Sequence, residues 1–266
     1  MKDINLKVIV PLHEYNKDIS KLLSEAVASV PENISVVVSC KNGIGDKVNK
    51  LLTDKKNVVV DEADKGAKTD FCSLVNRAVG GTEWFSILEY DDTYTKIWFD
   101  NFAKYKEFNS DVSVFVPLED LYKAETKEFI GFGNEATLAS SFSNELGFID
   151  HDCLQNFFDF YLTGSIFNTD DWNEIGGLKP SIKLSFWYEW LLRATYKGKK
   201  IYTIPKIGYN HTLGRKGSLL EQYKESVSDD EAKWLINLAK KEFYFKDERD
   251  ATKYIYDANK TSDDEE

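Results

Sequence analysis

Three carboxylates stand within four positions at the end of an apolar run, Trp-Phe-Ser-Ile-Leu-Glu-Tyr-Asp-Asp, residues 84–92. They are Glu89, Asp91 and Asp92, and their negative charges repel one another at this spacing unless a cation lies among them. Hard divalent cations such as Mg²⁺ and Mn²⁺ take oxygen ligands and commonly bridge to substrate phosphates. The motif therefore predicts a cation site at the end of a buried strand. The alternative is a strand that runs into a solvated acidic turn.

The segments before this motif alternate between strand and helix patterns. Strands are expected at residues 7–12, 34–39, 57–60 and 84–88, and helices at residues 17–30, 48–52 and 69–79 with Thr69 as the N-terminal cap. This alternation predicts a parallel sheet with right-handed crossovers. Ligands of such sheets bind beyond the carboxyl ends of the strands, which is where the acidic motif would lie.

The second half of the chain is less regular. A strand is expected at residues 112–116, a helix at 185–196 and a short strand at 201–204 that Pro205 closes, whereas residues 119–150 show no clear period. We expect one domain over residues 1–218, a helical extension packed on it over residues 219–258, and a disordered acidic tail over residues 259–266. No internal repeat is present.

Composition limits the classes of function. With 266 residues, of which 42% are hydrophobic, the chain can bury a large core. The net charge of −11 argues against binding of polyanions through a broad basic face. No apolar run approaches the roughly 20 residues of a membrane span, and the N-terminus has no apolar signal core. Together with three scattered cysteines, these features lead us to expect a cytoplasmic protein with reduced thiols.

Four local matches occur in a fixed order between residues 6 and 215. They are residues 8–11 followed by Tyr15-Asn16; Lys65-Gly66 followed by Asn76; residues 88–92; and Phe167 followed by Asp171, Gly176-Gly177, residues 191–193 and Gly198. The ordered set resembles the family 2 nucleotide-sugar glycosyltransferases. The resemblance implies the α/β GT-A fold, a Rossmann-like, mixed and mainly parallel sheet flanked by helices. It also implies transfer of a sugar from a nucleotide sugar to an acceptor hydroxyl.

The resemblance assigns roles around a divalent cation, Mn²⁺ or Mg²⁺. Asp91 would coordinate the cation directly, and Glu89 replaces the usual first Asp, which faces the ribose and a metal-bound water. His211 matches a late histidine that ligates the metal in many relatives; the alternative is a surface histidine in a loop. Arg215 and Lys216 would reach the diphosphate, and the alternative for them is a solvated basic loop.

The nucleoside of the donor would contact the residues after the first strand, here Pro11, His13 and Tyr15. Lys65 would touch the base or a phosphate, and the alternative for it is a solvated lysine in a turn. A UDP-sugar is the expected donor, but the base stays open because residues 39–42 lack the Asp that the family has after its second strand.

The catalytic base is less clear from the pattern. Inverting relatives carry an acidic pair about six residues before the Leu-Arg element, where this chain has Phe186 and Trp187. Glu189 is the nearest carboxylate on the expected helix, and Asp171 lies in the preceding turn. Both are candidates, and the alternative for Glu189 is an ordinary acid on a helix surface.

Several functions remain open at this stage. The expected acceptor is a glycan; the alternative is a phage-type enzyme that glycosylates hydroxymethylated bases in DNA and works in the host cytoplasm. A hypothesis of another class is a non-catalytic GT-A domain that binds a nucleotide sugar or glycan. A nucleotidyltransferase would need a glycine-rich phosphate loop, and residues 11–16 contain no glycine. The pattern does not define the oligomeric state.

Overall fold

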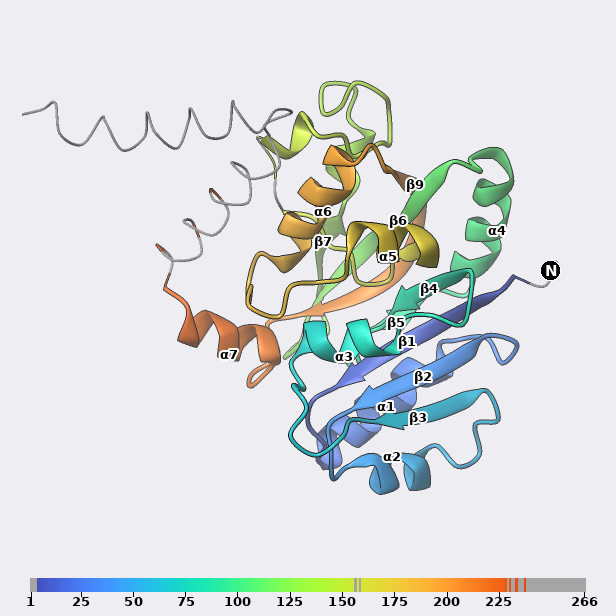
Figure 1. The fold of residues 1–266 in the computed structure, drawn as a ribbon, viewed down its shortest axis with the longest axis vertical. Helices are drawn as coiled ribbons and strands as arrows, with labels where there is room; N and C mark the ends of the chain where they lie inside the picture. The colour runs from blue at the N-terminus through green and yellow to red at the C-terminus, as the bar shows by residue number, and fades with distance from the viewer. Residues whose placement is uncertain are drawn as a thin grey trace, which may run out of the picture.

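The computed structural model describes residues 4–155, 157, 159–228, 230, 233 and 237. These residues form a nine-stranded mixed sheet with helices packed against it (Figure 1). The strand order is β3-β2-β1-β4-β8-β6-β9-β5, and β7 pairs with β6. The longest ladders of the sheet are parallel. The predicted fold class, a mixed α/β sheet with flanking helices, is confirmed.

The first half of the chain alternates strand and helix as the pattern predicts. Its elements are β1 (Leu6–Leu12), α1 (Lys17–Ala28), β2 (Ser35–Cys40), α2 (Gly45–Leu51), β3 (Val58–Glu62), α3 (Phe71–Ala78) and β4 (Trp84–Ile87). These four strands are parallel, and β1 lies between β2 and β4. Because β1 is covered on both faces, its apolar run is continuous: Val8 and Val10 enter one core, and Ile9 enters the other.

The N-terminus of α3 differs from the prediction. Asp70, and not Thr69, caps this helix. The Asp70 carboxylate accepts hydrogen bonds from the Ser73 backbone N–H at 3.0 Å and from the Ser73 hydroxyl at 2.7 Å. Both residue types are good caps, so the pattern alone does not choose between neighbours. Here Ser73, three residues after Asp70, donates both of its hydrogen bonds to Asp70, which makes Asp70 the cap.

The second half adds a strongly bonded pair of long strands. Its elements are β5 (Thr93–Tyr94), α4 (Trp98–Phe108), β6 (Val112–Lys123), β7 (Phe129–Gly133), the 3₁₀ turns η1 (Glu135–Leu138) and η2 (Cys153–Gln155), β8 (Ile166–Asn168), α5 (Thr169–Ile175), α6 (Phe186–Tyr196), β9 (Lys200–Leu213) and α7 (Leu219–Ser226). β8 runs antiparallel to both β4 and β6, which makes β6 parallel to β4. β9 then pairs in parallel with β6 along nearly its whole length.

Three expectations for this half are wrong. β6 runs past residue 116, the segment 119–150 contains β7 and part of β6, and β9 continues beyond Pro205. Ile204 pairs with Pro117 and Ile207 with Leu118, so the two residues between them bulge out of the ladder. A proline is tolerated there because the bulge removes the need for a backbone donor.

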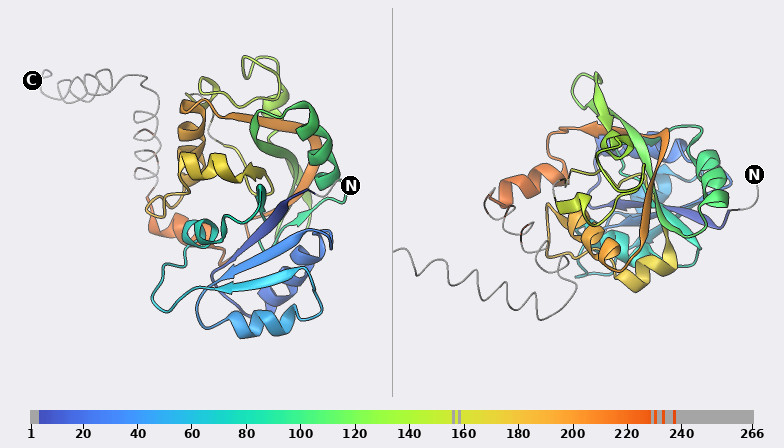
Figure 2. Two further views of the ribbon diagram at one scale, coloured as in Figure 1. Left: turned by 45° about the vertical axis from the view of Figure 1, so that its right-hand side comes forward. Right: turned by 90° about the horizontal axis from the view of Figure 1, so that it is seen from above.

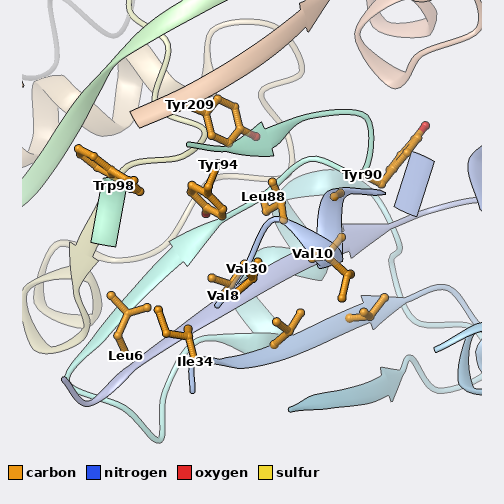
Figure 3. Packing of buried hydrophobic residues seen from close by; sticks show 14 of the residues in the cluster. Leu6, Val8, Val10, Val30, Ile34, Leu88, Tyr90, Tyr94, Trp98 and Tyr209 are labelled. Atoms are coloured by element: carbon orange, nitrogen blue, oxygen red, sulfur yellow. The ribbon is translucent and has the colours of Figure 1, made fainter. Parts of the chain in front are cut away.

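Two hydrophobic cores lie on opposite faces of the sheet, between the strands and the helices that cover both of its faces (Figure 2). The helices α1, α2 and α4 cover one face, and α3, α5 and α6 cover the other. Figure 3 shows the first core, in which Val8 and Val10 of β1 lie beneath Leu88 and Tyr90, with Tyr209 of β9 nearby. The strand β4 is buried on both faces as well, with Trp84 in the first core and Phe85 and Ile87 in the second, and the acidic motif follows directly after it.

The C-terminal segment is described only in part. α7 follows the loop after β9, and the Lys183 Nζ atom lies 3.4 Å from the Ser226 hydroxyl oxygen. Val227 after α7 is buried. Most of the expected extension, residues 219–258, and the whole of the expected tail, residues 259–266, lie outside the described residues, so those boundaries stay predictions. In the part of the chain that the structure describes, no helix is long and apolar enough to span a membrane.

Candidate functional site

The acidic motif lies at the carboxyl end of β4, as the sequence predicts. The backbone N–H of Leu88 still bonds to the carbonyl of Ile9 at 2.9 Å, and the N–H of Glu89 bonds to the Tyr209 hydroxyl oxygen at 3.1 Å. The chain then turns, because the N–H of Asp92 bonds to the carbonyl of Glu89 at 3.2 Å. The turn gathers the three carboxylates between the end of β4 and the strand β9.

Asp91 holds a guanidinium group. The Arg215 Nε atom donates to Asp91 Oδ2 at 2.7 Å, and Arg215 also donates to the Tyr90 hydroxyl. The guanidinium carbon lies 5.0 Å from the centre of the Tyr90 ring, a cation–π contact. Two residues that the sequence analysis singled out separately, Asp91 and Arg215, are thus brought together.

Asp92 is buried and only half satisfied. Its Oδ1 atom accepts the backbone N–H of Thr212 at 2.7 Å, whereas its Oδ2 atom is buried without a hydrogen-bond partner among the described residues. The contact ties the acidic turn to β9 next to His211. Asp92 therefore carries a carboxylate oxygen that the rest of the described chain does not neutralise.

His211 contacts an acid that the sequence analysis missed. Its Nδ1 atom lies 2.8 Å from Oε2 of Glu119, a fully buried side chain of β6. The Oε1 atom of Glu119, like Asp92 Oδ2, is buried without a partner among the described residues. The signal available in the sequence was an acid directly after Val-Phe-Val-Pro-Leu, but the strand was expected to end before it.

The pKa values of three acids in this cluster and of His211 are raised, because these acids are buried with few positive charges near them. Burial, with a further contribution from Asp91, raises the pKa of Glu89 to about 7. Burial likewise raises the pKa of Asp92 well above its usual value and raises that of Glu119. Burial alone would lower the pKa of His211, but the carboxylates of Asp92 and Glu119 outweigh it and raise that pKa to about 10. The cluster thus holds protons where a cation would relieve the repulsion.

The donor set fits the divalent cation that the resemblance implies. Carboxylate oxygens and an imidazole nitrogen are ligands that Mn²⁺ accepts, and the unpartnered Asp92 Oδ2 shows that the turn can take up more positive charge. Among the described residues, no three side chains of His, Cys, Asp or Glu are already gathered as a metal centre. Asp91 Oδ2 holds Arg215 instead, so a cation at Asp91 would share this carboxylate with Arg215 or displace it.

The predicted nucleoside contacts lie beyond the end of β1. Pro11 is buried within β1, and the half-buried His13 and Tyr15 follow that strand. The His13 ring lies 6.0 Å from the Tyr90 ring, and burial lowers the pKa of His13. The strand end at β1 and the acidic turn are therefore neighbours, as a donor site requires.

Two predicted basic residues lie apart from the acidic turn. Lys65 is exposed in the loop between β3 and α3. Lys216 is 86% exposed, and its Nζ atom lies 3.1 Å from the carboxylate of Glu125. Their roles toward the donor stay predictions, because each exposed side chain would have to extend from the protein surface to reach the ligand.

Glu189 is neither exposed nor free. It is 1% exposed, and its two oxygens accept from Arg193 Nε at 2.7 Å and Arg193 Nη2 at 2.9 Å. Lys179 Nζ lies 2.8 Å from the same carboxylate, and Arg193 also donates to the carbonyls of Ile175 and Gly177. The alternative of an ordinary acid on a helix surface is therefore wrong.

Asp171, the second candidate base, is paired as well. Its Oδ1 atom accepts from Lys199 Nζ at 2.6 Å, and its side chain is 28% exposed. At the position where the resemblance would place the acid, Trp187 instead stacks on Phe167 at a ring distance of 5.8 Å. The catalytic roles of Glu189 and Asp171 stay predictions.

Comparison with known proteins reveals likeness at the level of fold. No protein-family model matches the sequence, and no curated protein matches it. Residues 1–349 of TarS from S. aureus, solved in complex with UDP-GlcNAc, share 16% identity and a TM-score of 0.54 over 81% of this chain and 60% of that chain. The mannosyltransferase PcManGT from Pyrobaculum calidifontis, solved with GDP-Man and Mn²⁺, shares 14% identity and a TM-score of 0.57 over 80% of this chain and 58% of that chain.

The chain therefore spans about 60% of the length of these structures. At such identities the likeness shows a common fold, the GT-A arrangement of a mixed α/β sheet with flanking helices.

Proposed function

We propose that this chain is a glycosyltransferase that moves a sugar from a nucleotide-sugar donor to an acceptor hydroxyl with the help of a divalent cation. The observation that carries the proposal is the cluster of Glu89, Asp91 and Asp92 at the carboxyl end of β4, where the buried Asp92 Oδ2 atom has no partner in the described part of the chain. It is supported by the fold shared with proteins solved in complex with UDP-GlcNAc and with GDP-Man and Mn²⁺.

The chemistry of the reaction accounts for such a cluster. The departing nucleoside diphosphate gains negative charge in the transition state, and a bound cation supplies the Lewis acid that stabilises this charge. Asp91 would hold the cation directly, with Glu89 and His211 beside it. Once Arg215 is released from Asp91, its guanidinium group is free to donate to the diphosphate, and Lys216 lies on the same loop.

The donor would extend from this cluster over the end of β1. We assign the nucleoside to Pro11, His13 and Tyr15, and Lys65 to the base or a phosphate. A UDP-sugar is the proposed donor. His13, whose pKa burial lowers, would meet the nucleotide as a neutral ring.

The acceptor hydroxyl must lose its proton to a base. Glu189 and Asp171 are the proposed candidates, and each would first have to part from a basic side chain. Asp171 is the more accessible because its side chain is 28% exposed, whereas that of Glu189 is 2% exposed. We propose a glycan acceptor, since the net charge of −11 disfavours a DNA duplex. The free and buried cysteines Cys40, Cys72 and Cys153 suit the proposed cytoplasmic setting.

A thermal shift series tests the proposal. The protein is melted with a panel of nucleoside diphosphates and sugar nucleotides, each with and without Mn²⁺. We expect stabilisation that needs both Mn²⁺ and one nucleotide, since only a ligand of the folded state raises the melting temperature. Asp91→Ala should lose this stabilisation.

The matched control is Asp111→Ala, because Asp111 is an exposed acid at the amino end of β6, whereas the acidic turn follows the carboxyl end of the parallel strand β4. It should keep the full stabilisation. If no nucleotide stabilises the wild type in the presence of Mn²⁺, the proposal is wrong.

A further inference from the structure

The imidazole of His211 is held from several directions. Its Nδ1 atom lies 2.8 Å from Glu119 Oε2, and the Tyr161 ring meets it edge-on, with 5.0 Å between ring centres and an angle of 90°. The backbone is fixed too, because His211 is paired with Leu121 in the β6–β9 ladder and the next N–H donates to Asp92. The ring position is therefore defined by two strands and the acidic turn.

This arrangement leaves one ring nitrogen for a ligand. In the part of the chain that the structure describes, Nδ1 has the partner Glu119, and Nε2 makes no hydrogen bond. The His211 side chain is 13% exposed, so the ring is not sealed. The charges of Asp92 and Glu89 act on it from nearby. A ligand that binds this histidine would meet Nε2.

Glu119 has little reason to be buried except for His211. It is 0% exposed in a strand that is mainly apolar up to this residue, and its Oε1 atom has no partner among the described residues. Burial of a half-satisfied carboxylate is unfavourable for folding. The hydrogen bond with His211 is the interaction in the structure that offsets this unfavourable burial.

We propose that Glu119 is a positioning residue, which binds His211 through Nδ1 and thereby presents Nε2 to the divalent cation of the donor site. The inference rests on the proposed function, since it assigns a partner to a predicted metal ligand. Side chains that hold the second nitrogen of a metal-bound histidine fix the orientation of its ring and increase its basicity. Glu119 would act through His211 and would touch neither donor nor cation.

The test is the affinity for Mn²⁺ in the presence of UDP, measured by electron paramagnetic resonance of the free ion. Glu119→Ala should weaken Mn²⁺ binding by about 10-fold or more. Glu119→Gln should stay close to the wild type, because its amide oxygen can accept the same hydrogen bond. His211→Ala and the double variant His211→Ala/Glu119→Ala should bind Mn²⁺ equally, since Glu119 acts only through the ring.

The matched control is Asp120→Ala, which removes the neighbouring, partly exposed acid of β6 and should leave Mn²⁺ affinity unchanged. Equal Mn²⁺ affinity of the wild type and folded Glu119→Ala would overturn the inference and leave the proposed function standing. Absence of Mn²⁺ binding to the wild type with every nucleotide tested would overturn both.

A second measurement covers the case in which Glu119→Ala does not fold. In the wild type labelled with ¹⁵N-histidine, with His211 assigned from His211→Asn, traces of Mn²⁺ should broaden the Nε2 signal before the Nδ1 signal. Earlier broadening of Nδ1 would overturn the inference, because it would place the ion on the side that Glu119 occupies.

Discussion

Two groups of buried carboxylates in this molecule differ in how they are neutralised. Glu189 accepts hydrogen bonds from Arg193 at both oxygens and has Lys179 beside it. In the second group, the acidic turn with its neighbours, Asp92 Oδ2 and Glu119 Oε1 have no partner among the described residues. A carboxylate that its own chain neutralises is part of the architecture. A buried carboxylate oxygen without a partner in the described chain has a cost that a bound cation would offset, as we propose for the acidic turn.

The neutralised group also explains a sequence motif. Arg193 donates to the carbonyls of Ile175, Gly176 and Gly177 and so ties α6 to the turn after α5. A Cβ atom at Gly177 would lie 2.3 Å from Asn76 Oδ1, so this turn also packs closely on α3. The Gly176-Gly177 turn and Arg193 of the Leu-Leu-Arg element thus contact each other directly, and their role here is structural.

The largest expected effect comes from removing a charge of the second group, the acidic turn. Asp91→Asn should lower release of nucleoside diphosphate from the sugar nucleotide by at least about 10³-fold, because the cation loses a ligand in the transition state. The melting temperature should stay near that of the wild type, since Arg215 loses only a partly exposed ion pair. The assay follows kcat/KM with water as the acceptor; activity within a few-fold of the wild type would contradict the assignment.

Breaking the neutralised group should affect stability instead. Arg193→Ala leaves Glu189 buried without its main partner and should lower the free energy of unfolding by about 3–5 kcal/mol. The matched control is Arg77→Ala, which breaks the more exposed pair with Asp61 and should cost about 1 kcal/mol or less. Urea unfolding measures both; equal losses for the two variants would show that burial does not distinguish the pairs.

Glu189→Gln separates a structural from a catalytic role for this acid. The amide keeps the shape and part of the hydrogen bonding, so we expect a loss of about 1–3 kcal/mol in the free energy of unfolding. Donor turnover and acceptor transfer should persist at temperatures where the variant is folded. A stable variant that hydrolyses the donor but no longer transfers the sugar would instead identify Glu189 as the base.

The smallest expected effect is a dependence of stability on pH. The pKa of Glu89 is raised to about 7 and that of His211 to about 10, while those of Asp92 and Glu119 are also raised. Each group binds protons more tightly in the folded state, so each contribution to stability is present at low pH and is lost as pH rises through the folded pKa.

Without metal, the melting temperature should therefore fall by several degrees between pH 6 and pH 10, and Mn²⁺ with nucleotide should reduce the fall. Calorimetry across this range measures the effect. A melting temperature that rises with pH would show that the acids of the cluster are neutralised in another way.

The first half of the fold and the place of the acidic motif could be predicted from the sequence. Continuous β-branched runs such as that of β1 arise because both faces are buried, and a strand end is recognisable where such a run meets acids. His211 could be found only through the resemblance, and Arg215 through its place just beyond it, since a lone histidine or arginine carries no period. The structure brings both to the acidic turn, through Asp92 at the neighbouring Thr212 and through Asp91.

The remaining features depend on partners distant in the chain. β8 is three residues long and forms because β4 and β6 lie on either side of it, which no local pattern reveals. Glu119 was missed for the same reason, since its strand extends by pairing with β7 and with β9 beyond the bulge at Pro205. Glu189 and Arg193 lie one helical turn apart, so their pairing could be predicted from the spacing. The burial of this pair could not.

The central claim is that the acidic turn, where buried oxygens lack a partner among the described residues, binds the cation together with a nucleotide, and that the neutralised Glu189 does not. Isothermal titration of Mn²⁺ into the wild type, Asp91→Asn and Glu189→Gln in the presence of UDP tests it most directly. We predict that the wild type and Glu189→Gln bind Mn²⁺ and that Asp91→Asn does not. Unchanged binding by Asp91→Asn, or loss of binding by a folded Glu189→Gln, would contradict the account.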